Sequence, residues 1–169
     1  MKELDTRDVL IYFALKYEGN WDRCVHAIKT HEAMSKAEYE SLLKTNHSKM
    51  VTMVDDEYPC CLKLVMKPPL VLFYHGDISV LSDQNKNIAY VGSREASEYG
   101  IKAAKNICKE LAENGYNIIS GLAYGIDTAA TLGALEGKGR AVAVLGNGID
   151  YCYPSENTPL YKNLINDGL

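Results

Sequence analysis

The sequence predicts an α/β fold, a Rossmann-like doubly wound parallel sheet preceded by a small helical module. From residue 87 onward, apolar strand-like runs alternate with helical periodicity three times, and a glycine-bearing turn follows each run. The third run, Arg140–Leu145, is almost continuously apolar, which is typical of a parallel strand buried on both faces. Units that alternate in this way indicate a parallel sheet with right-handed crossovers. Three strands are few for an open sheet, so we expect the sheet to be incomplete at the C-terminus.

Residues 1–50 predict three short helices, which we interpret as a SAM-like module. Thr6 is positioned to cap the first helix, and Asn20 to cap the second. Ser35 and Glu38 have the spacing of a capping box before the third.

Residues 51–84 predict a connecting segment with one or two short strands. Proline and glycine pairs separate its β-prone runs, of which Leu70–Tyr74 is the clearest. We expect this strand to join the parallel sheet or its edge.

Residues 85–169 predict the Rossmann-like domain. Its first two strands are expected at Ile88–Val91 and Asn117–Ser120. Its helices are expected at Ser97–Asn114, which Gly115 ends, at Ile126–Glu136, and from Thr158 onward.

Composition limits the classes of function. The 169 residues are 47% hydrophobic and carry a net charge of −4, so any nucleic-acid site must be a local patch on an acidic protein. The five cysteines have no framework spacing, which favours reduced thiols in a cytoplasmic protein. We find no signal peptide, no apolar run of membrane-spanning length and no spacing of metal ligands, and we expect no cofactor.

Glycine-bearing loops follow the strands, at the edge where doubly wound sheets bind ligands. The first holds Gly92, Ser93 and Arg94, and the second runs from Gly121 to Asp127. Backbone N–H groups at helix starts favour anions, and a guanidinium can hold a phosphate through two hydrogen bonds. Two alternatives stay open: Arg94 forms a surface ion pair with Glu95 or Glu98, and Asp127 only caps its helix or orients the loop.

Other signatures are absent or ambiguous. The sequence has neither Gly-x-x-x-x-Gly-Lys-Ser/Thr nor Gly-x-Gly-x-x-Gly, and all four histidines precede the α/β region. Tyr99 and Tyr124 lie near the two loops and could stack on a base, or pack against a neighbouring loop.

Between Tyr58 and Pro154 the chain contains a series of motifs. They are Tyr58-Pro59-x-x-Leu62, Pro68-Pro69-x-x-Leu72-Phe73-Tyr74-x-Gly76-Asp77, Ala89-x-Val91-Gly92-Ser93-Arg94-x-x-Ser97-x-Tyr99-Gly100, Ser120-Gly121-x-Ala123-x-Gly125-Ile126-Asp127, Gly133-Ala134-Leu135 and Ala143-Val144-Leu145-Gly146-x-Gly148-Ile149-Asp150-x-x-Tyr153-Pro154. Together, in this order and spacing, they resemble the DNA-processing protein A (DprA, or Smf) family.

The resemblance implies a protein that binds single-stranded DNA in natural transformation, protects incoming strands and helps load the recombinase RecA, and that is not an enzyme. It implies a homodimer in the full-length protein. The residues that it assigns to DNA or phosphate binding are Gly92, Ser93, Arg94, Ser97, Gly121, Ala123, Gly125, Ile126, Asp127 and Arg140.

Two departures from the family pattern stand out. Thr131 replaces the family's usual histidine, and the family's later half, with its Arg-Asn-Arg segment, is missing. The alternative function is a nucleotide hydrolase or phosphoribosyl-type enzyme, in which Asp127 or Glu136 acts on a ribose.

Overall fold

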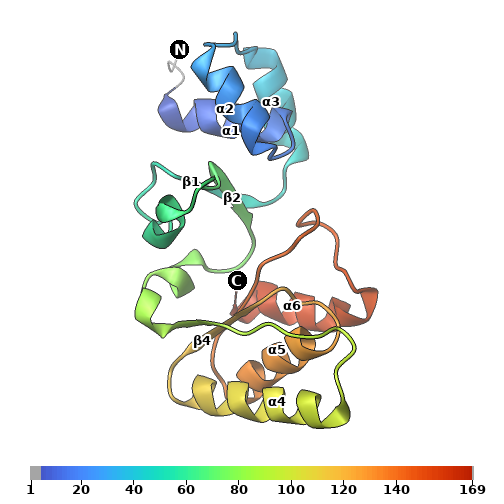
Figure 1. Cartoon of the computed structure of the whole chain (residues 1–169). Coiled ribbons are helices and arrows are strands. Elements are labelled where there is room, and N and C mark those ends of the chain that lie inside the picture. The colour runs from blue at the N-terminus through green and yellow to red at the C-terminus, as the bar shows by residue number, and fades with distance from the viewer. Residues whose placement is uncertain (1–4, 169) are drawn as a thin grey trace. The chain divides into compact units, whose positions relative to one another are not determined.

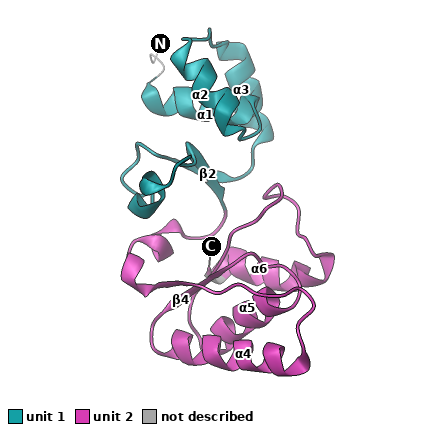
Figure 2. Cartoon of the chain, viewed as in Figure 1, with its two compact units in different colours: residues 1–74 teal, residues 75–169 magenta. Residues whose placement is uncertain are grey.

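The structure is a computed structural model that describes residues 5–168, and the chain divides between Tyr74 and His75 into two compact units (Figure 2). The predicted connecting segment, residues 51–84, is shared between them. The elements of the first unit are α1 (Thr6–Lys16), α2 (Trp21–Lys29), α3 (Lys36–Thr45), β1 (Lys49–Thr52) and β2 (Val71–Tyr74) (Figure 1).

Side-chain caps begin the three helices of the first unit. Asn20 and Ser35 accept hydrogen bonds from the N–H groups three residues ahead, which confirms both caps. The reciprocal half of the predicted capping box does not form, because the Ser35 N–H donates to the Tyr12 hydroxyl oxygen, and the Glu38 carboxylate accepts from that same hydroxyl. The predicted cap at Thr6 is wrong. Asp5 caps α1 instead, because its carboxylate and that of Asp8 each accept the other residue's N–H, at 3.0 and 3.1 Å.

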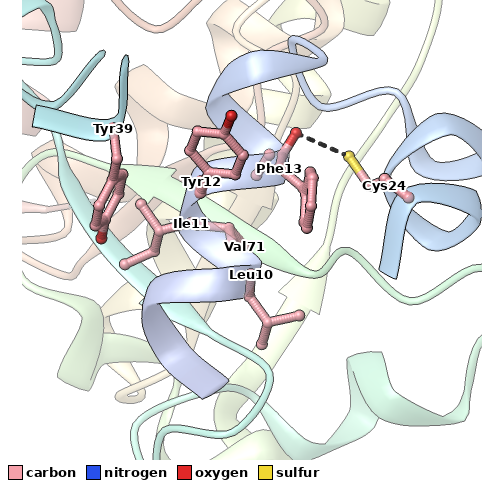
Figure 3. Packing of buried hydrophobic residues seen from close by; sticks show 9 residues of the cluster. Leu10, Ile11, Tyr12, Phe13, Cys24, Tyr39 and Val71 are labelled. Atoms are coloured by element: carbon pink, nitrogen blue, oxygen red, sulfur yellow. Dashed lines mark hydrogen bonds between the residues drawn. The ribbon is translucent and has the colours of Figure 1, made fainter. Parts of the chain in front are cut away.

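The core of the first unit is centred on α1. Leu10 to Ala14 span more than one turn and are all almost completely buried, so the middle of α1 is enclosed on every side, in one cluster with Cys24, Tyr39 and Val71 (Figure 3). The Cys24 thiol donates to the Phe13 carbonyl at 3.2 Å, which joins α2 to α1. Burial of these side chains is the main stabilising term for so small a unit.

Strands β1 and β2 pair with each other in antiparallel register, with Lys49 opposite Tyr74 and Thr52 opposite Val71. The expectation that the Leu70–Tyr74 strand joins the parallel sheet is therefore wrong. The physical reason is burial, since Val71 belongs to the α1 core and this holds β2 within the first unit.

The second unit contains a parallel three-stranded sheet flanked by helices, which confirms the predicted α/β, Rossmann-like class. The strands lie in the order β3-β4-β5. Its elements are β3 (Asn87–Ala89), α4 (Glu98–Glu113), β4 (Asn117–Ser120), α5 (Ile126–Glu136), β5 (Ala141–Ala143) and α6 (Thr158–Asp167) (Figure 1).

The outer strands are shorter than the sequence predicts. Strand β5 ends at Ala143, and Val144 is 63% exposed. Val144 still donates its N–H to the Ser120 carbonyl at 2.8 Å, but Ser120 is the last residue of β4. The ladder stops because the central strand ends there.

Helices α4 and α5 pack closely through glycine. A Cβ placed on Gly133 would lie 2.2 Å from the Lys105 carbonyl oxygen, and one on Gly137 would lie 2.5 Å from that of Lys109. Alanines and Cys108 fill the space between these helices and Ile118 of β4. All five cysteines are free thiols, and burial raises the pKa of Cys108 to about 11.

Candidate functional site

Three loops leave the carboxyl ends of the parallel strands. We call residues 90–97 the first loop, 121–125 the second loop and 144–157 the third loop. Ligands of doubly wound sheets bind at this edge, so the loops are the natural place to look for a site.

The first and second loops meet through their backbones. The Ile126 N–H donates to the Ser93 carbonyl at 3.1 Å. A Cβ on Gly125, whose φ is +74°, would lie 2.3 Å from the Ser93 oxygen and 2.7 Å from the Arg94 oxygen. A Cβ on Gly92 would lie 2.7 Å from the Ile126 side chain. Only glycine permits this approach, which brings together Gly92, Ser93, Arg94, Gly125 and Ile126.

Arg94 is exposed and carries an unpaired charge. Within residues 5–168 its guanidinium makes no hydrogen bond or ion pair, and neither Glu95 nor Glu98 is its partner. Two hydroxyl groups shape the loop around it. Ser93 Oγ accepts the Glu95 N–H at 3.1 Å, and Ser97 Oγ accepts the Gly100 N–H at 3.2 Å as the cap of α4. Both serines keep an O–H donor.

Asp127 is directed into the second loop. Its side chain is buried, and Oδ2 accepts the Gly121 N–H at 3.0 Å. The carboxylate therefore orients the glycine turn and uses one of the backbone donors expected to face a ligand. In the described part of the chain, the N–H groups of Ala123, Tyr124 and Gly125 have no acceptor. Gly125, the last of the three, packs against the carbonyl groups of Ser93 and Arg94.

A network of buried polar side chains fixes the second loop to the fold. No sequence pattern predicts this network. Asn157 Nδ2 donates to the Leu122 carbonyl at 2.9 Å and to Thr128 Oγ1 at 2.8 Å. Thr131 Oγ1 donates to the Asp127 carbonyl at 3.0 Å and lies 3.2 Å from Ser120 Oγ. Thr131, at the family's histidine position, is thus 2% exposed and bonded inside the fold.

Two predicted site residues, Ala123 and Arg140, are less well placed to bind a ligand at the three loops. The Ala123 carbonyl is used by Thr128, whose N–H and hydroxyl donate to it at 3.2 and 2.6 Å. Arg140 precedes β5, so it lies at the amino edge of the sheet, opposite the three loops. Its guanidinium pairs with Asp77 at 2.9 Å. Hydrogen bonds from Ser79, then from Arg140, lower the pKa of Asp77.

The third loop is open at its glycines and anchored at its end. A Cβ on Gly146 or Gly148 would have no atom within 4 Å. Asn157, at the end of this loop, is the residue that holds Leu122 of the second loop. The second and third loops are therefore fixed to each other.

Similarity to known proteins covers the same residues. The family model of the DNA recombination-mediator protein A matches residues 49–169, more than half of the chain. This chain belongs to the DNA recombination-mediator protein A family. The match spans the whole parallel sheet and all three loops, so it includes the edge of the sheet at which Arg94 lies.

Individual family members show the same relationship. DNA processing protein DprA of Streptococcus pneumoniae is 41% identical over 118 residues, covering 70% of this chain and 41% of that protein. DprA of Bacillus subtilis is 38% identical, covering 64% of this chain and 36% of that protein. The chain thus spans about two fifths of the length of these relatives.

Solved structures of the family agree with the fold. The crystal structure of S. pneumoniae DprA has a TM-score of 0.69 at 30% identity and covers 96% of this chain and 61% of that one. A DprA structure from Helicobacter pylori, described in terms of its single-stranded DNA binding mode, has a TM-score of 0.62 at 26% identity and covers 72% and 54%.

Residues 5–168 lack two features that would point to other kinds of site. No helix among them combines the length and apolarity needed to cross a membrane. Nor do they contain a group of three or more His, Cys, Asp or Glu side chains placed to hold a metal ion.

Proposed function

We propose that this chain binds single-stranded DNA by its phosphates at the first and second loops, as part of a recombination mediator in natural transformation. The observation that carries the proposal is the close backbone contact between the two loops, Ser93 and Arg94 against Gly125, which joins the loop of the unpaired Arg94 to the loop with the free N–H groups of Ala123, Tyr124 and Gly125. Backbone donors and a guanidinium together suit a phosphate oxygen and read no base sequence.

Family membership supports this choice of ligand. The related H. pylori protein is described as binding single-stranded DNA. Protection of incoming strands, delivery to RecA and dimerisation of a longer product rest on the resemblance to the family. They are part of the proposal for the whole protein.

Charge decides how the site works. The second unit carries 8 Lys and Arg against 11 Asp and Glu, so bulk attraction to DNA is absent. Affinity must come from a few local contacts, of which Arg94 is the strongest candidate.

The positions of Asp127 and Glu136 do not support the alternative function, a nucleotide hydrolase or phosphoribosyl-type enzyme. Asp127 is bonded to Gly121, and Glu136 lies at the other end of α5 in an ion pair with Lys105 at 2.5 Å. At 1.5 Å per residue, the two acidic residues are about 14 Å apart along the helix, so neither can serve as the second acidic group for a ribose held by the other.

The proposal predicts that Arg94→Ala weakens binding of a labelled oligothymidylate about 10- to 100-fold, since a hydrogen bond to a charged group contributes about 1.5–3 kcal/mol. Fluorescence anisotropy at several salt concentrations measures this. For each phosphate interaction that the substitution removes, the slope of log affinity against log salt should become shallower by about 0.7.

Lys86→Ala is the matched control, because Lys86 is an exposed cation just before β3, at the amino edge of the same sheet. It should leave affinity unchanged. Titration of the isotope-labelled chain by NMR detects weak binding and locates it. Equal affinity of Arg94→Ala and wild type, or shifts confined to residues outside the two loops, would overturn the proposal.

A further inference from the structure

Two exposed tyrosine rings meet beside the proposed phosphate site. Tyr124 belongs to the second loop and Tyr153 to the third, and their ring centroids lie 6.1 Å apart at an interplanar angle of 81°. Tyr124 is 39% exposed and Tyr153 is 49% exposed. Rings that served only to pack the loops together would be expected to bury more of their surface in the fold.

Tyr124 is anchored at its hydroxyl although its ring is exposed. The Tyr124 hydroxyl donates to Glu156 Oε2 at 2.8 Å, and this bond raises the pKa of Tyr124. Glu156 precedes Asn157, which fixes the second loop to the third through Leu122. A fixed aromatic surface loses little conformational entropy when a flat ligand stacks on it.

The position of the pair relates it to Arg94. Tyr124 directly precedes Gly125, the glycine whose Cα packs against the carbonyl groups of Ser93 and Arg94. Aromatic rings that stack on bases, together with cationic groups that follow the backbone, are the combination by which proteins hold single strands. The Glu156 carboxylate beside the ring repels phosphates, which favours the base side of a strand over its backbone.

We propose that Tyr124 and Tyr153 form a base-stacking subsite for an unpaired nucleobase of the strand whose phosphate is bound at Arg94. The subsite rests on the proposed function and adds to it a reason for preferring single strands. The bases of a duplex are already stacked on each other and cannot reach the rings.

The test compares two probes in the full 169-residue chain: an oligothymidylate, and an abasic oligomer of equal length that keeps the phosphates and lacks the bases. Tyr124→Ala and Tyr153→Ala should each weaken binding of the oligothymidylate about 5- to 100-fold, the range for loss of one stacked base. Binding of the abasic oligomer should not change, which also shows that the variants are folded.

Two control variants sharpen the comparison. Tyr124→Phe keeps the ring and loses only the hydrogen bond to Glu156, so it should retain most of the binding that Tyr124→Ala loses. Tyr116→Ala removes another exposed tyrosine, which precedes β4 at the amino edge of the sheet, and should bind both probes normally.

The outcomes separate the two proposals. If wild type binds both probes equally and the tyrosine variants change neither, the stacking subsite is wrong while the phosphate site stands. If Tyr124→Ala weakens both probes alike, the ring only shapes the loop, and the subsite is again wrong. If wild type binds neither probe, the proposed function itself fails.

Discussion

Asn157 is the residue on which the shape of the second loop most depends. It is 7% exposed, and its amide supplies the Leu122 carbonyl and the Thr128 hydroxyl with a donor. Leu122 has a positive φ of 55° and no exposed surface, a conformation that a leucine adopts only when its surroundings impose it.

We therefore expect Asn157→Ala to lower the free energy of unfolding by about 1–3 kcal/mol, because it leaves two polar groups without their donor. Urea unfolding followed by circular dichroism measures this. Asn163→Ala on the exposed side of α6 is the control and should change stability by less than about 0.5 kcal/mol. A decrease no larger than that of the control would show that water or a neighbouring group replaces the amide.

The role of Asn157 cannot be predicted from the sequence, and the reason is physical. Periodicity reports which face of a helix or strand is buried, whereas this amide acts through two hydrogen bonds to groups 35 and 29 residues away. Glycine is different, because a glycine in a turn between a strand and a helix is a local signal that can be read without knowing the fold, although Gly146 and Gly148 after β5 show that such a glycine need not make a close contact. For that reason the sequence predicts Gly92 and Gly125 as site residues, and does not predict the polar residues beneath them.

At the scale of elements, the contact between α4 and α5 depends on a residue without a side chain. Gly133→Ala places a methyl group 2.2 Å from the Lys105 carbonyl oxygen, so the helices must separate. Overpacking of this kind costs about 1–3 kcal/mol, more than the roughly 0.5–1 kcal/mol that alanine gains in a helix.

Gly100→Ala is the matched comparison within α4. The nearest atom to its Cβ would be Ser97 Oγ at 3.5 Å, an ordinary contact, so only the gain in helix propensity remains. We expect the thermal unfolding temperature to move down for Gly133→Ala and slightly up for Gly100→Ala. Two variants that shift in the same direction would show that helix propensity, and not packing, decides stability at these positions.

The elements that the sequence predicts well are those whose signals are local. Helix α5 begins at Ile126 and ends at Glu136 as predicted, because alanine and the flanking glycines define it. The pairing of β1 with β2 is not predicted, since it joins segments separated by 18 residues with no hairpin turn between them. The sheet that β2 joins becomes clear only from the structure, in which Val71 is buried in the core of the first unit.

At the scale of the whole second unit, Arg140 lies across the sheet from the other site residues. Strand β5 has three residues, so about 10 Å of sheet separates Arg140 from the loops at the carboxyl edge. A short ligand held at Arg94 does not need Arg140, whereas a long strand running past the sheet can reach it. Contact with a phosphate would then compete with the ion pair to Asp77.

Length of the oligonucleotide therefore decides whether Arg140 belongs to the DNA path. Arg140→Ala should leave binding of about 6 nucleotides unchanged and weaken binding of about 20 nucleotides, lengths chosen around the 4–16 nucleotides that single-strand sites commonly cover. For the longer strand, the salt slope should fall by about 0.7, as expected for one phosphate contact. Arg94→Ala, measured beside it, should weaken both lengths. An effect of Arg140→Ala on neither length would remove this residue from the path, and an equal effect on both would mean that its ion pair with Asp77 supports the fold rather than the strand.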